Sequence, residues 1–423
     1  MDGKQDKYFA FFIALLPILN IYGLGVPGIS IGKLIIVFII IWGIILRKYD
    51  LPSFPKLFLL YFLYILIVPQ LFTLITGEAK LGSIIYKSIG SLFFLFILGY
   101  GCKYLNFKYL IRYYELIVIV CCAFFFVQEL AFDLFNLKII GIISWLPLTN
   151  MDSTIEHISR MNEFSRSSSF FLEPSHFVQF ISIFLVMKVF SKRKNFVDFS
   201  SVFISLILVF AQSGIGYLAL LLVWVSFFVF CLYRRKHVLA IVLTLVIMGG
   251  LSMPIGNRLG VFSGEKDSPL SRISELSSRE VEYTSGYIRI YRGYVFYSGL
   301  TPVEKIVGIG LGSLETYLEY QPMPKYEELL FSTKDDYYLN GIQQHLVFGG
   351  IIGLFLYLLF LFKLLRHNSI IGKIVVLLII LLGFVTMTFN DVIILLMLIF
   401  AFLFKVQNVE NKQITEEIKT DIQ

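Results

Sequence analysis

Residues 57–76 read LFLLYFLYILIVPQLFTLIT, a run without a single charged side chain that directly follows Lys56. As a helix, a run of this length spans about 30 Å, which matches the hydrocarbon core of a bilayer. Similar runs recur along all 423 residues, of which 57% are hydrophobic and only 15% charged. Soluble domains are nearer 25% charged. The composition therefore excludes a soluble enzyme with one anchor and predicts an all-α polytopic membrane protein.

Apolar runs bounded by charge clusters predict about 12 transmembrane helices. Their approximate ranges are 8–24, 28–46, 57–76, 83–101, 113–132, 171–190, 197–212, 214–232, 238–253, 341–363, 370–387 and 391–405. If the N-terminus is cytoplasmic, most basic residues of the short connections fall on the cytoplasmic side, as membrane topology requires. The net charge of +7 then reflects cytoplasmic lysines and arginines that orient the helices, so no nucleic acid partner is expected. Residues 1–423 form one membrane domain in this interpretation, with 406–423 as a cytoplasmic tail.

Two predicted outer segments are too long to be simple turns. Residues 133–170 begin with an apolar stretch containing Lys138 and Trp145, which predicts a helix lying in the headgroup plane. Residues 253–337, between the ninth and tenth helices, contain 9 basic and 12 acidic residues, and 285–299 within them predict an amphipathic helix. The late position of this loop argues against two six-helix transporter halves. Because the cytoplasmic loops are short, we expect any chemistry to occur outside, on substrates carried by a lipid.

Residues 166–179 read RSSSFFLEPSHFVQ and form the most informative short stretch. If Pro174 occupies the first turn of the helix, Glu173 lies at its entrance, and His176 and Gln179 share one face. A carboxylate and an imidazole near the Arg166 guanidinium could supply acid/base chemistry and anion binding at the outer boundary. The alternative is a solvated helix cap, because a glutamate is favourable at a helix N-terminus.

The amphipathic helix at 285–299 places Arg289 and Arg292 on one face. Guanidinium groups bind phosphate through paired hydrogen bonds, so the two would suit a pyrophosphate. The alternative is an exposed loop helix whose arginines pair with nearby glutamates such as Glu304. After Arg292, Gly308 and Gly310 could expose N–H groups to phosphate, but the strand and helix of a dinucleotide-binding loop are missing. A tight turn returning the loop to the membrane is the favoured interpretation.

Acidic and imidazole groups also lie where the chain re-enters the membrane. Asp335 and Asp336 precede the tenth helix, and His345 lies one or two turns inside it. Either aspartate could act as a base, or both could simply cap the helix. Asn390 and Asp391, at the last outer turn, are a further candidate for lining a cavity.

The residues give little support to a metal site, and no cofactor is expected. The outer histidines are His157, His176 and His345, which form no i, i+4 pair and have no cysteine nearby. The first outer loop, 20–33, contains no acidic residue. It therefore lacks the paired carboxylates that many metal-dependent lipid-linked glycosyltransferases carry there.

Taken in order, these motifs resemble the superfamily of O-antigen polymerases (Wzy) and O-antigen ligases. Arg166 stands shortly before Phe-Phe-Leu-Glu-Pro-Ser at 170–175, and Arg292 is followed after fifteen residues by Gly308, as in the arginine-x15-glycine pattern of polymerases. Residues 338–354 then resemble the family's return into the membrane. Where ligases usually place a histidine before that helix, this chain has Asp335 and Asp336, which favours the polymerase.

The resemblance implies a GT-C-like fold in the bacterial inner membrane, with both termini cytoplasmic and the active site periplasmic. It implies an inverting, metal-independent transfer of a glycan from undecaprenyl pyrophosphate to an undecaprenyl-pyrophosphate-linked repeat unit. The expected partners are these lipid-linked oligosaccharides, membrane lipids and a chain-length regulator protein. The expected pyrophosphate-binding residues are Arg166, Arg289 and Arg292. The candidate catalytic residues are Glu173, Asp336, His176 and His345, with Gly308 and Gly310 in a supporting loop.

Two other functions remain open on the sequence. An O-antigen ligase would transfer finished polymer to a lipid A core. A flippase or transporter for lipid-linked oligosaccharides would place charges at mid-membrane, whereas the candidate polar residues here are predicted at the outer boundary.

Overall fold

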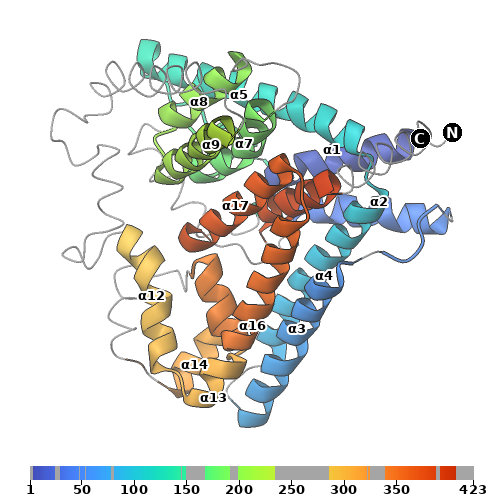
Figure 1. Cartoon of the computed structure of the whole chain (residues 1–423), viewed down its shortest axis with the longest axis vertical. Coiled ribbons are helices and arrows are strands. Elements are labelled where there is room, and N and C mark those ends of the chain that lie inside the picture. Colours follow the sequence, from blue (N-terminus) through green and yellow to red (C-terminus); the bar gives the residue numbers. More distant parts are fainter. Residues whose placement is uncertain are drawn as a thin grey trace. The chain divides into compact units, whose positions relative to one another are not determined.

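The computed structural model describes residues 3–23, 29–46, 48–52, 54–77, 81–143, 145–148, 167–190, 199–233, 285–321, 323, 339–386 and 391–405 (Figure 1). Helices make up most of these residues. No β-strand lies among them, and an isolated bridge pairs Tyr22 with Leu148. The predicted all-α architecture is therefore confirmed for the part of the chain that is described.

A described helix lies in every predicted membrane range except 238–253, which is outside the described residues. In chain order these helices are α1 (Gly3–Leu19), α2 (Ile31–Ile45), α3 (Lys56–Thr76), α4 (Leu81–Tyr104), α5 (Phe107–Phe135), α7 (Pro174–Val189), α8 (Phe199–Phe210), α9 (Gly214–Tyr233), α16 (Gly341–Arg366), α17 (Ile370–Val385) and the helix Val392–Lys405. Four of them, α3, α5, α9 and α16, are long and apolar enough to cross a membrane.

Large apolar side chains cover much of the outside of these helices. Phe38 is 66% exposed, Ile75 84% and Phe355 61%, each on a different helix. Exposed apolar surface of this extent is unfavourable in water and favourable against lipid tails. The chain is therefore a helical membrane protein.

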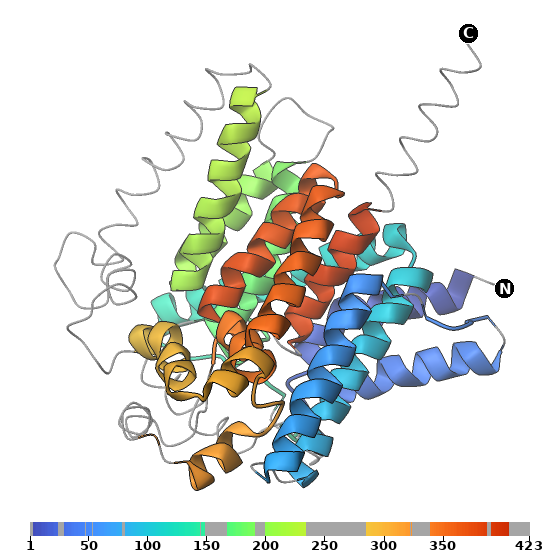
Figure 2. The ribbon, with the colours of Figure 1, turned by 60° about the horizontal axis from the view of Figure 1, so that its bottom comes forward.

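The described residues divide into two compact units. The first contains the described residues of 1–20, 26–113 and 289–423, and the second contains those of 21–25 and 114–288. In the first unit α1 packs on α2, and α3 packs on α4 and α16 (Figure 2). In the second unit α7 packs on α8 and α9.

Helix α16 is not one straight helix, because it breaks at Gly350, where φ is 63° and ψ is −167°. His345 and Tyr357 lie on opposite sides of this break, with ring centroids only 3.7 Å apart. Twelve residues of a straight helix would separate their Cα atoms by about 18 Å. The segments before and after Gly350 therefore fold back on each other, which the apolar pattern of 341–363 did not predict.

The segment after α5 also differs from the prediction. Helix α5 ends at Phe135, Asn136 has a φ of 51°, and residues 136–143 and 145–148 are not helical. The expected headgroup-plane helix within 133–170 is thus absent from these residues. Tertiary contacts hold them instead: Gln128 Nε2 donates to Ile139 O at 2.9 Å, and Ile143 N donates to the Tyr22 hydroxyl at 3.0 Å.

Candidate functional site

The predicted amphipathic helix is confirmed as α12 (Ser285–Gly299). Arg292 and Phe296 are four residues apart on α12, so they share one face, and Leu300 directly follows the helix. All three are buried, and Arg292 is 0% exposed. The alternative of an exposed loop arginine is therefore wrong for Arg292. The side chain of Arg289 lies outside the described part of the structure.

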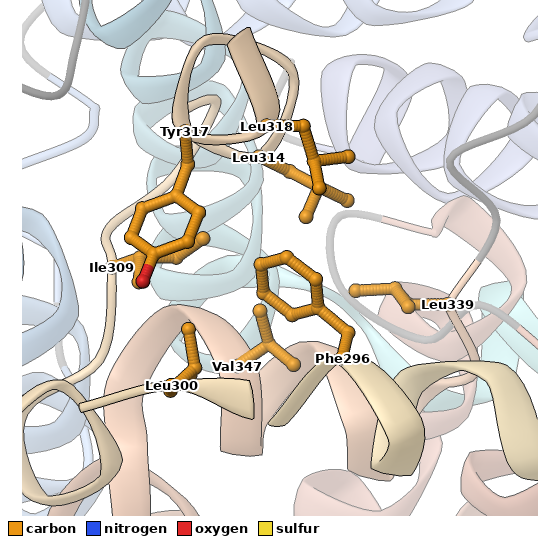
Figure 3. Close-up of a cluster of buried hydrophobic side chains, with 8 residues drawn as sticks. All are labelled: Phe296, Leu300, Ile309, Leu314, Tyr317, Leu318, Leu339 and Val347. Carbon is orange, nitrogen blue, oxygen red and sulfur yellow. The ribbon is translucent and has the colours of Figure 1, made fainter. Parts of the chain in front are cut away.

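A cluster of buried hydrophobic side chains fixes α12 in place (Figure 3). Phe296 from α12 and Leu300, which directly follows this helix, meet Val347 from α16 and Tyr317 from α14 (Leu314–Tyr320). The remaining members are Ile309, Leu314, Leu318 and Leu339. Beside the cluster, the Tyr297 hydroxyl donates to Lys305 O at 3.0 Å, and burial raises the pKa of Tyr297. The turn of α12 that carries Arg292 is thus anchored from its C-terminal side.

The start of α16 anchors the same turn of α12 from the other side. Gln343 and Asn340 form a reciprocal cap, in which Gln343 N donates to Asn340 Oδ1 at 2.9 Å. Gln343 Nε2 also donates to Ile290 O at 2.5 Å. A Cβ atom at Gly293 would lie 2.6 Å from Gln343 Cδ, so only glycine allows this approach. The contact brings the Arg292 turn against the first turn of α16.

His345 lies two residues further along α16 and is 2% exposed. Its Nδ1 atom is 2.5 Å from the hydroxyl oxygen of Tyr61 on α3. Its ring also packs against Tyr357 of the same helix. The structure therefore places His345 and Arg292, two predicted site residues, on neighbouring buried turns joined by Gln343.

Gly308 and Gly310 hold the loop after α13 against the break in α16. They have φ values of 90° and 78°, and they follow α13 (Pro302–Val307). Ile309 N donates to Val347 O at 3.0 Å, and Gly310 N donates to Phe348 O at 3.1 Å. These bonds satisfy two carbonyl groups next to the break in the helix. The Gly310 N–H is therefore engaged with α16, and the Gly308 N–H donates to Glu304 O at 2.7 Å, so neither faces a phosphate.

The Tyr64 hydroxyl on α3 contacts both this loop and the break in α16. It is 3.0 Å from Val307 O and 3.1 Å from Gly349 O. A Cβ at Gly310 would lie only 2.8 Å from Gln70 Oε1 of the same helix. The glycines thus permit close packing of the loop on α3 and α16, which is a supporting role.

A buried carboxylate at Glu304 was missed by the sequence analysis as a site in its own right. It is 2% exposed, and its Oε2 accepts hydrogen bonds from Thr301 N at 2.7 Å and from the Tyr317 hydroxyl at 2.8 Å. The pattern Thr301-x-x-Glu304 is a capping box, and its sequence signature could have located the start of α13. The Tyr317 bond depends on tertiary contact and has no local signal.

The second unit contains Glu173, His176 and Gln179. The predicted helix start is confirmed, with Glu173 at the N-cap and Pro174 in the first turn of α7. Glu173 Oε2 accepts a hydrogen bond from Ser175 Oγ at 2.6 Å. His176 is half-buried, and Gln179 is buried with an Nε2 atom that has no hydrogen-bond partner among the described residues. A buried amide donor of this kind favours an oxygen acceptor.

Gln128 fixes the chain that leads into α7. Its Oε1 accepts from Ser169 N at 2.8 Å, and its Nε2 donates to Ser169 O at 3.3 Å. Ser169 has a φ of 54°, which is uncommon for serine and needs such support. Arg166 and Asp336 lie outside the described residues, so the structure describes no contact of either.

A second missed residue is Lys33, which ends the predicted first outer loop. It lies in the first turn of α2 and is only 8% exposed. Asp391 is the charged group that acts on it electrostatically. Asp391 Oδ1 also accepts from Ile393 N at 2.7 Å, which caps the helix Val392–Lys405. A lysine inside an apolar helix is a signal that could have identified this position.

Comparison of the chain with family models gives no match, and comparison with curated proteins gives none either.

Proposed function

We propose that the chain polymerises lipid-linked repeat units of O-antigen, or of a similar polysaccharide, at the periplasmic face of the bacterial inner membrane. The growing glycan moves from undecaprenyl pyrophosphate to the non-reducing end of another undecaprenyl-pyrophosphate-linked repeat unit. The bond between the anomeric carbon and the pyrophosphate oxygen breaks, and a glycosidic bond forms. The acceptor hydroxyl loses its proton to a base. The proposal includes twelve membrane-spanning helices, a GT-C-like arrangement of these helices and cytoplasmic termini.

The burial of Arg292 is the observation that supports it. A guanidinium with 0% exposure, on a helix of the predicted outer loop, is costly to bury and is rarely placed there for stability alone. Gly293, Gln343 and Phe296 hold its turn from two sides. A preorganised cation of this kind stabilises charge that develops on a departing pyrophosphate.

The other roles follow from the chemistry of the side chains. Arg289 and Arg166 assist in binding the pyrophosphates, because guanidinium groups bind phosphate oxygens in pairs. Glu173 or Asp336 takes the proton of the acceptor hydroxyl. The reaction is inverting if the acceptor attacks the anomeric carbon directly, from the face opposite the pyrophosphate.

The test is reconstitution of the purified protein in liposomes with synthetic lipid-linked repeat units and no ion gradient. We expect a ladder of products, followed by linkage analysis. Arg292→Ala should slow elongation about 100-fold or more, because one lost donor to a developing oxyanion costs that much. Arg292→Lys keeps the charge but not the paired hydrogen bonds, so it should be intermediate.

The matched control is Arg112→Ala, because Arg112 is exposed on α5. It should elongate like the unchanged protein. Arg292→Ala that stays folded and gives normal chain lengths would remove the basis of the proposal. Transfer only to lipid A core would identify a ligase, and movement of the lipid-linked substrate without elongation would identify a flippase.

A further inference from the structure

The side chains around His345 define which of its two ring nitrogens carries the proton. Tyr61 comes from α3, and Tyr357 comes from the part of α16 beyond the break at Gly350. The Tyr61 hydroxyl lies 2.5 Å from His345 Nδ1, and the Tyr61 ring stands at 75° to the imidazole. The Tyr357 ring covers the imidazole at 3.7 Å with an interplanar angle of 31°.

All three rings are buried: Tyr61 is 1% exposed, His345 2% and Tyr357 4%. A third ring contact joins the two tyrosines, whose centroids are 5.4 Å apart. The imidazole is thus held by two separate helical segments in addition to its own. Rotation of the ring would break the Tyr61 bond and disturb close packing, so its orientation is fixed.

The hydrogen-bond partners of Tyr61 show which atom donates in its bond with His345. Within the described ranges, its hydroxyl has one hydrogen-bond partner, His345 Nδ1. If Nδ1 carried the proton and donated it, the buried Tyr61 O–H would have no acceptor, at a cost of about 1–3 kcal/mol. If Tyr61 donates, its proton is satisfied and Nδ1 is the acceptor. The second arrangement is therefore favoured.

Burial also favours the neutral form of the imidazole over the charged one. A neutral imidazole carries one proton, and when Nδ1 accepts a hydrogen bond that proton lies on Nε2. Nε2 is then a donor and offers no lone pair for a proton. The opposite tautomer would have left Nε2 as a base.

We propose that Tyr61 holds His345 in the Nε2–H tautomer, so that His345 acts as a neutral hydrogen-bond donor to a phosphate oxygen of the lipid-linked substrate. The location supports this ligand, because Gln343 joins the His345 turn to the buried Arg292 turn of α12. Tyr61 and Tyr357 are positioning residues. This inference rests on the proposed function, and it removes His345 from the candidates for the base.

The first test measures the tautomer and needs no activity. The protein is labelled with 15N-histidine, reconstituted in bilayers and examined by solid-state NMR, with His345→Gln identifying the His345 signals among the five histidines. We expect an unprotonated Nδ1 that accepts a hydrogen bond, and a protonated Nε2. A protonated Nδ1 would overturn the proposal.

Two tyrosine variants show whether Tyr61 sets this state. Tyr61→Phe should shift the Nδ1 signal, because its donor is lost. Tyr64→Phe is the matched control on the same helix, because its hydroxyl contacts Gly349 O and not His345. Its Nδ1 signal should stay in place. Equal spectra for Tyr61→Phe and the unchanged protein would contradict the assigned role of Tyr61.

The second test uses elongation in the reconstituted system. Glutamine keeps an N–H donor near the Nε2 position but cannot act as a base, whereas leucine has no donor. His345→Gln should stay within about tenfold of the unchanged protein, and folded His345→Leu should lose about 100-fold or more. His367→Gln, at an exposed position, is the control.

The outcomes separate the two proposals. If His345→Gln is folded and as slow as His345→Leu, a donor is insufficient and the assignment fails. If the unchanged protein does not elongate any repeat unit, the proposed function fails. In that case the NMR result still decides the tautomer that Tyr61 imposes.

Discussion

Replacing Gly350 by alanine should unfold the region that carries His345 and Gly308. At Gly350, φ is 63° and ψ is −167°, a combination that essentially only glycine adopts. A Cβ atom there would overlap the carbonyl oxygen of Ile306 and would lie 2.7 Å from Gly308 N. Both neighbours are backbone atoms, so no side-chain rotation relieves the overlap.

The expected cost has two parts. The backbone strain of a residue with a side chain in this region is about 1–3 kcal/mol. Separating the two segments would also break the bonds from Ile309 N to Val347 O and from Gly310 N to Phe348 O. At about 0.5–1.5 kcal/mol each, they bring the total to roughly 2–6 kcal/mol of unfolding free energy.

The measurement is equilibrium unfolding in mixed micelles with increasing sodium dodecyl sulfate, followed by circular dichroism. Gly353→Ala is the matched control, because the nearest atom to its Cβ would be Tyr64 Cε1 at an ordinary 3.4 Å. Alanine in a helix is about 1 kcal/mol better than glycine, so this control should be neutral or stabilised. Equal stability of Gly350→Ala and Gly353→Ala would refute the reasoning about the break.

Two further variants test particular contacts. Tyr317→Phe removes the hydroxyl that donates to buried Glu304 Oε2 at 2.8 Å, and should lower the unfolding free energy by about 1–3 kcal/mol in the same titration. Tyr320→Phe, at a 61% exposed position, should change it by less than about 0.5 kcal/mol, and equal losses would contradict this contact. Lys188→Met breaks the 2.5 Å ion pair with Glu115, whose side chains are 23% and 37% exposed. Because solvent screens the pair, the loss should be at most about 1 kcal/mol and should shrink in high salt, so a larger loss that persists in salt would show a stronger pair.

Local patterns were enough to predict the helices and several of their ends. The apolar run at 57–76 became α3, and 285–299 became α12 with the predicted bounds. Pro174 after Glu173 correctly indicated the start of α7. These features depend on hydrophobic periodicity and capping, which involve residues only a few positions apart.

The candidate site was only partly predictable for the same reason. Arg292 and His345 were identified by residue type and position, but nothing local indicates that both are buried. The Tyr61 partner of His345 is 284 positions away in the sequence. A hydrogen bond of that sequence separation has no periodic or capping signature, so no single motif indicates it.

The sequence by itself determined that this is a helical membrane protein, because apolar runs of bilayer length leave the backbone no better way to satisfy its hydrogen bonds in lipid. Only the tertiary structure decided that α16 folds back at Gly350 and that Arg292 is buried against its first turn. Gly350 breaks the helix because Ile309 and Gly310 bond to Val347 and Phe348, and a glycine alone does not predict such partners. Burial of a charge is likewise decided by whatever packs around it.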